Sequence, residues 1–169
     1  MSELLRMEHI SKRFGSFYAN KDISLTVNRG EVLTLLGENG AGKSTLMKCL
    51  FGVYSKDGGH IYVDGQEVNY KNSKEALENG VAMVHQELNQ ALKRNVMDNM
   101  WLGRFPTVSK FLPFTSEKKM YDETARIFKE LEINVDPKTI MSTMPVSQRQ
   151  MVEIAKAVSY NSKIIVFDE

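Results

Sequence analysis

The sequence predicts an α/β fold with a largely parallel sheet. Apolar segments of strand length alternate along the chain with helical stretches in which apolar residues recur every three or four positions. Its 169 residues are enough to bury a sizeable core. Hydrophobic residues make up 42% of the chain and charged residues 25%, as in an ordinary globular protein. Because no repeat or linker interrupts the pattern, we expect a single domain.

The strands are predicted from short apolar runs bounded by turn residues. They fall at residues 23–27, 31–36, 61–63, 66–68 and 81–84. Segment 31–36 is mostly apolar, which is typical of a strand covered on both faces. Asp64 and Gly65 form a two-residue hairpin turn between the third and fourth strands.

The helices are predicted from apolar periodicity and from residues that favour helix ends. One helix follows a glycine-rich loop at residues 44–51, and a short one begins at Ser73, which is predicted to cap it, and ends before Gly80. A central helix is expected to carry one mostly apolar face: Tyr121, Thr124, Ala125, Ile127, Phe128, Leu131 and Glu132. The last helix, at residues 147–159, has an apolar stripe of Met151, Ile154, Ala155 and Val158. An apolar strand then ends in Asp168 and Glu169.

The charge balance gives no reason to expect nucleic acid as a partner. Lys plus Arg number 22 and Asp plus Glu 21, so the formal net charge is +1. The single cysteine, Cys49, allows no internal disulfide, which favours a reducing cytoplasm. The first nine residues lack the apolar centre of a signal peptide, and no run of about 18 apolar residues occurs. At a membrane, another protein would have to hold the chain.

The glycine-rich loop matches the phosphate-loop pattern G-x-x-x-x-G-K-[ST] over residues 37–44. Glycines allow the main chain to curl so that its N–H groups point inward, and these groups and the helix start attract anionic oxygen. Lys43 is expected to reach the β- and γ-phosphates, and the Ser44 hydroxyl to ligate magnesium. We expect the following residues to bind nucleotide: Gly37, Glu38, Asn39, Gly40, Ala41, Gly42, Lys43, Ser44 and Thr45. A chance match is expected in on the order of one in a few hundred chains of this size.

The two terminal carboxylates supply what a phosphate loop lacks. An apolar strand places Asp168 where it would hold a magnesium-bound water, and Glu169 where it would polarise the attacking water. The competing interpretation is a solvated strand end, since many buried strands end in an acidic residue. The phosphate loop in the same chain favours the catalytic interpretation.

Four features stand in one order along the chain: the phosphate loop, Val84-His-Gln-Glu87, the helix that begins Val146-Ser-Gln-Arg-Gln150, and the terminal acidic strand. This order resembles the ATP-binding cassette (ABC) family. Segments 74–80, 83–88 and 97–103 are most similar to the sugar importers that carry two cassettes per chain. The resemblance covers the whole chain.

The resemblance implies a phosphate-loop NTPase with a RecA-like core, an N-terminal antiparallel β subdomain and an inserted helical subdomain, truncated after the Walker B strand. It places the β subdomain and loop core at residues 1–90, the helical subdomain at 91–160 and the Walker B strand at 161–169. Further family segments, including the switch histidine, would follow residue 169. We therefore expect residues 1–169 to bind Mg-ATP with little or no turnover.

The resemblance also assigns roles to individual residues. Phe14 resembles the aromatic that stacks on adenine, a role for which Phe17 and Tyr18 compete. Gln86 resembles the glutamine that contacts magnesium and the attacking water. The helix at 147–159 resembles the signature helix, which implies that Ser147 and Gln148 bind the γ-phosphate held by an opposite cassette.

The signature segment departs from the family's Leu-Ser-Gly-Gly-Gln. Residues 144–148 read Met-Pro-Val-Ser-Gln, so that Pro145 replaces the phosphate-binding serine and has neither hydroxyl nor N–H. Ser147 is then the candidate donor. An ordinary helix start competes with this interpretation.

The function implied is ATP hydrolysis that drives sugar uptake. The implied partners are integral-membrane permease subunits, a second cassette placed head to tail and, indirectly, a sugar-binding protein, with the chain at the cytoplasmic face of the membrane. Two alternatives remain open: a regulatory module that binds nucleotide without hydrolysis, and a soluble cassette protein unconnected to transport.

Overall fold

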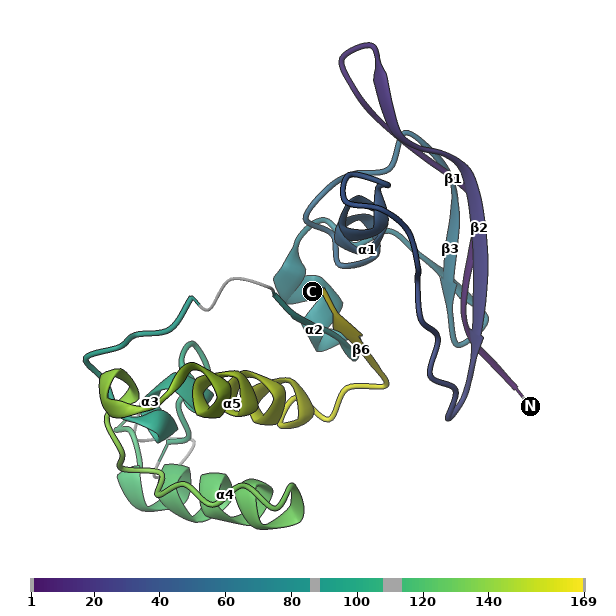
Figure 1. Cartoon of the computed structure of the whole chain (residues 1–169). Coiled ribbons are helices and arrows are strands. Elements are labelled where there is room, and N and C mark those ends of the chain that lie inside the picture. The colour runs from purple at the N-terminus through teal and green to yellow at the C-terminus, as the bar shows by residue number, and fades with distance from the viewer. Residues whose placement is uncertain (1, 86–88, 108–113, 169) are drawn as a thin grey trace. The chain divides into compact units, whose positions relative to one another are not determined.

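A computed structural model describes residues 2–85, 89–107 and 114–168 (Figure 1). The chain forms two compact units. The first comprises residues 1–82 together with Asp168, and the second residues 83–167.

The first unit is built on an antiparallel sheet in the order β2-β1-β3-β4 (Figure 1). The strands span β1 (Glu3–Phe14), β2 (Phe17–Asn28), β3 (Gly58–Val63) and β4 (Gln66–Val68). Sequence analysis predicted part of β2 but no β1. The pairing of β1 with β2 shifts register near His9, whose φ is +53°, and such bulges interrupt the apolar alternation that marks a strand.

The predicted hairpin between β3 and β4 is confirmed. Val63 pairs with Gln66, and both turn residues, Asp64 and Gly65, have positive φ values of 55° and 73°. Two positive φ values define the turn type that matches the twist of paired strands, and Gly65 adopts such a value without steric cost.

Helix α1 (Lys43–Leu50) contacts β1 and β2, and α2 (Ser73–Glu78) begins as predicted, with one correction. The residue that caps α2 is Asn72 and not Ser73, because the Asn72 side chain accepts the N–H of Glu75 at 3.0 Å. Asparagine caps a helix as well as serine does, so the residue types alone did not show whether Asn72 or Ser73 is the cap.

The predicted strand at residues 31–36 is wrong for this structure. The segment forms no ladder with any described strand, and Val32 and Leu36 are 93% and 90% exposed. An apolar sequence becomes a buried strand only where neighbouring strands satisfy its main-chain groups, and the described residues provide no such neighbour. The predicted strand at 81–84 does form: β5 (Val81–Val84) pairs with β6 (Ile164–Phe167) in a two-stranded sheet.

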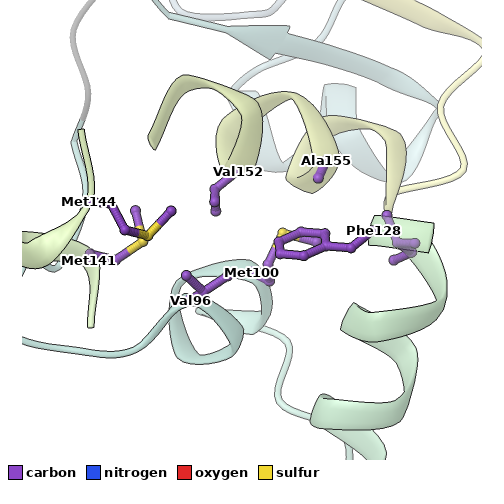
Figure 2. Packing of buried hydrophobic residues seen from close by; sticks show 8 residues of the cluster. Val96, Met100, Phe128, Met141, Met144, Val152 and Ala155 are labelled. Carbon is purple, nitrogen blue, oxygen red and sulfur yellow. The ribbon is translucent and has the colours of Figure 1, made fainter. Parts of the chain in front are cut away.

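Apart from β6 and the end of β5, the second unit is helical. It contains α3 (Val96–Trp101), α4 (Glu117–Glu130), a 3₁₀ turn (Met141–Thr143) and α5 (Val146–Val158). Figure 2 shows its core, in which side chains from all four elements meet. The buried members are Val96, Met100, Ile127, Phe128, Met141, Met144, Val152 and Ala155.

The structure corrects the buried face of α5 and confirms the centre of the face predicted for α4. On α5 the buried residues include Val152 and Ala155, whereas Met151, predicted inside, is exposed. On α4 the buried face centres on Thr124, Ile127 and Phe128. Periodicity gives the width of an apolar stripe, but its centre is decided by the neighbours against which the helix packs.

Candidate phosphate-binding site

The loop at residues 37–44 curls through two glycines with left-handed backbone. Gly40 and Gly42 each have a φ of +84°, a conformation that other residues adopt only with strain. At Gly37 space is the constraint instead, because a Cβ there would lie 3.3 Å from the Ala41 Cβ, a tight contact. The three glycines of the pattern therefore serve two different needs.

The Lys43 ammonium group forms hydrogen bonds to the main chain of the loop. Its Nζ donates to the carbonyl oxygens of Gly37 at 2.6 Å and Glu38 at 2.9 Å. The Ala41 N–H also donates to the Glu38 carbonyl, at 3.1 Å. These bonds place a positive charge directly at the curled main chain.

The start of α1 is open to an anion. Its capping residue, Gly42, offers no side-chain acceptor, and the first turn contains no acidic residue. The first N–H groups of a helix lack partners within the helix, and the helix dipole adds partial positive charge there. The loop and helix start together form the kind of anion site that binds phosphate.

Ser44 and Asp168 are brought into direct contact, although 124 residues separate them. The Ser44 hydroxyl donates to Asp168 Oδ1 at 2.5 Å, and both side chains are partly buried. Asp168 directly follows β6 and belongs with Ser44 to the first unit. Hydroxyl and carboxylate oxygens are hard metal ligands of the kind that magnesium prefers. This pair therefore fits a magnesium ion that also binds phosphate.

Phe14, the last residue of β1, packs against one neighbouring aromatic ring. Its ring meets Tyr54 edge-on, with centroids 5.3 Å apart and planes at 78°. The Asp57 carboxylate anchors the same strand end by accepting the Arg13 N–H at 2.6 Å, and this bond lowers the pKa of Asp57. The residue remains 45% exposed, so it is accessible to a ligand.

The competing aromatics are also exposed: Phe17 by 65% and Tyr18 by 46%. Exposure alone therefore does not choose between Phe14, Phe17 and Tyr18 as the adenine-stacking residue. The contact with Tyr54 distinguishes Phe14, because it links this ring to the segment that follows α1.

Ser147 and Gln148 lie in the first turn of α5, in the second unit, and both are exposed. Pro145 caps this helix without a side-chain hydrogen bond. The remaining predicted site residues, Gln86 and Glu169, lie outside the described residues.

Two polar contacts near the predicted site residues had no signal in the sequence. The Asn20 amide donates to the Gly42 carbonyl at 3.1 Å, across 22 residues. Gln90 donates to the Arg149 carbonyl and to Glu153 Oε1, each at 2.9 Å, and thereby ties the segment after β5 to α5. Neither asparagine nor glutamine forms part of a recognisable motif, so only the folded chain reveals these contacts.

In the described parts of the chain, every helix is too short or too polar to cross a membrane.

The chain is similar to curated proteins of one kind. It is 62% identical over 168 residues to the galactose/methyl galactoside import ATP-binding protein MglA of Clostridium perfringens, and 60% identical over 166 residues to that of Fusobacterium nucleatum. These matches cover 99% and 98% of this chain but 32% and 33% of the relatives. The chain thus spans about a third of their length.

Solved structures agree on the fold. A nucleotide-free ATP-binding cassette from an ABC transporter superposes with a TM-score of 0.84 at 29% identity, covering 99% of this chain and 69% of that one. A cassette in its ADP conformation also gives 0.84, at 27% identity, covering 98% and 68%. The predicted α/β phosphate-loop fold with an antiparallel sheet near the N-terminus is confirmed.

The sequence profile of the ABC transporter family matches residues 20–169. The match includes the glycine-rich loop, the helix predicted at 147–159 and the terminal acidic strand, which are among the segments on which the sequence resemblance rested. The chain belongs to the ABC transporter family.

Proposed function

We propose that this chain binds Mg-ATP as the ATP-binding part of an importer for galactose or methyl galactoside. The observation that carries the proposal is the contact of Ser44 with Asp168 beside the open start of α1. It joins a phosphate site to two magnesium-compatible oxygens. The similarity to the import proteins of Clostridium perfringens and Fusobacterium nucleatum supports the transported sugar.

The residues take distinct roles in this proposal. Lys43 binds the β- and γ-phosphates, and the loop amides from Gly37 to Thr45 surround the phosphate chain. Ser44 and Asp168 hold magnesium, which when bound neutralises phosphate charge. Phe14 stacks on adenine.

Two further residues are assigned to hydrolysis. Gln86 orients the attacking water and contacts the metal, and Glu169 accepts a proton from that water. Both assignments rest on the sequence, because the two residues lie outside the described part of the chain.

The decisive experiment is calorimetric titration of the 169-residue chain with a non-hydrolysable ATP analogue, with and without magnesium. We expect one saturable site whose affinity increases when magnesium is present. Absence of binding in a folded sample would refute the proposal.

Asp168→Asn tests the metal site. Asparagine keeps the size of the side chain but removes the charge, and loss of a group that orients or binds a metal costs about 10- to 100-fold in metal affinity. We expect the gain in affinity on adding magnesium to shrink about tenfold, while affinity without magnesium stays unchanged. Asp122→Asn, at an exposed position on α4, is the matched control. An unaltered magnesium response in Asp168→Asn would remove this residue from the metal site.

In the whole transporter we propose that closure of two head-to-tail cassettes drives permease subunits, which receive sugar from a binding protein. The chain then acts at the cytoplasmic face of the membrane. Ser147 and Gln148 contact the γ-phosphate bound by the opposite cassette.

A regulatory module that binds nucleotide with little turnover is the second candidate. It is favoured by Pro145, which caps α5 with no hydroxyl to offer a phosphate. Comparing ATP affinity with hydrolysis rate in the full-length protein separates the two. Tight binding with negligible hydrolysis supports the module, and steady hydrolysis supports the transporter ATPase.

A further inference from the structure

Asn20 connects β2 to the phosphate loop. It is only 6% exposed, and its Nδ2 donates to the Gly42 carbonyl at 3.1 Å. The loop and β2 are in close contact here, because a Cβ on Gly42 would overlap the Ala19 carbonyl oxygen and lie 2.7 Å from Asn20 Nδ2. The loop therefore packs directly against β2 at Ala19 and Asn20.

This amide is poorly explained by stability alone. The Gly42 carbonyl already accepts the Leu46 N–H at 2.9 Å, so it would stay hydrogen-bonded without Asn20. The other end of the amide, Oδ1, is buried and accepts no hydrogen bond from the described residues. Burying such an oxygen is unfavourable, and a leucine of similar size would avoid it.

The bond does act on the geometry of the loop. A trans peptide is planar, so the carbonyl of Gly42 and the N–H of Lys43 point in opposite directions in one plane. Gly42 has a left-handed φ, and glycine has no Cβ to restrict its backbone dihedrals, so this plane can turn more easily than at other residues. Holding the carbonyl against β2 keeps the Lys43 N–H directed out of the helix start.

We propose that Asn20 is a positioning residue for the phosphate loop: its amide orients the Gly42–Lys43 peptide and so aligns the first amides of α1 for phosphate. The inference rests on the proposed Mg-ATP binding for its effect on affinity. Its effect on the loop itself is independent of any nucleotide.

Asn20→Leu is the principal test, and Asn79→Leu is its matched control. Asn79 also donates its amide to a main-chain carbonyl, that of Glu75 at 2.8 Å, at the end of α2. Three quantities are measured on the 169-residue chain: amide exchange over residues 40–46 without nucleotide, affinity for the magnesium-bound ATP analogue, and the thermal midpoint.

For Asn20→Leu we expect amide exchange at Leu46, whose N–H donates to the Gly42 carbonyl, to rise about fivefold and affinity to fall about fivefold, the effect of losing one hydrogen bond. The thermal midpoint should stay level or rise. Asn79→Leu should change neither exchange in the loop nor affinity. Unchanged exchange and affinity in Asn20→Leu, or a lower midpoint with unchanged affinity, would overturn the proposal.

Asn20→Asp provides a second readout that a merely structural role would not produce. At about pH 8 the carboxylate has no proton to donate and repels the Gly42 carbonyl, whereas burial favours a neutral acid that can donate at about pH 5. We expect the affinity deficit relative to wild type at the same pH to shrink on acidification. A deficit that does not change with pH contradicts the role. If wild type binds no analogue, the proposed function fails, while the exchange comparison still decides the role of Asn20.

Discussion

Lys43→Ala is expected to lower the affinity for Mg-ATP about 100-fold. The ammonium group lies at the curled main chain, within 2.9 Å of two loop carbonyls. On binding it would exchange these neutral carbonyls for anionic phosphate oxygens, and in Lys43→Ala the bound phosphate charge would be left without this partner, which costs about 3 kcal/mol. This loss corresponds to about two decades in the dissociation constant. Calorimetric titration with the ATP analogue measures the change.

Lys74→Ala is the control for this variant. Lys74 lies on α2, and its side chain is 84% exposed in a loose ion pair with Glu78. Such a pair contributes little to stability, so this variant should bind nucleotide as wild type does. Wild-type affinity in Lys43→Ala would refute the assignment of the phosphate loop. A fall of similar size in Lys74→Ala would show that general charge, and not the position of Lys43, determines affinity.

Gly42→Ala is expected to lower the free energy of unfolding of the first unit by about 3 kcal/mol. A left-handed φ of +84° costs about 1 kcal/mol for alanine. The added Cβ would also overlap the Ala19 carbonyl oxygen and lie 2.7 Å from Asn20 Nδ2, and overpacking of this kind costs about 2 kcal/mol. Urea denaturation followed by far-UV circular dichroism measures the difference.

Gly40→Ala separates the two contributions. Gly40 has the same φ of +84°, but nothing lies within 4 Å of the position that an added Cβ would take, so only the backbone strain remains. We expect a loss of about 1 kcal/mol for this variant. Equal losses in the two variants would show that the loop does not rest on β2 at Gly42.

A hypothesis for the chemistry of the site could be drawn from the sequence because it depends on short motifs. Residues 37–44 combine glycine, lysine and serine at the spacings of a phosphate loop. This pattern can be recognised in the sequence without knowing the rest of the fold. The pairing of Ser44 with Asp168 could be expected as a role but not as a contact. A hydrogen bond across 124 residues depends on the path of the whole chain.

Local structure was predictable where local forces decide it. The turn at Asp64 and Gly65 and the extents of α1 and α5 follow from turn residues and periodicity within a few positions. The structure of segment 31–36 was not predicted correctly, because a strand is stabilised by hydrogen bonds to other strands and not by its own sequence. β1 escaped prediction for another reason: the register shifts near His9 interrupt the apolar alternation that marks a strand.

By itself the sequence determined the family and the phosphate-loop pattern, and it predicted the residues for phosphate and metal, because short motifs are properties of neighbouring positions. Only the tertiary structure decided which face of α5 is buried, that Tyr54 supports Phe14 and that Asn20 holds Gly42. Those contacts join residues far apart in the chain, and their energies arise only after the elements have packed.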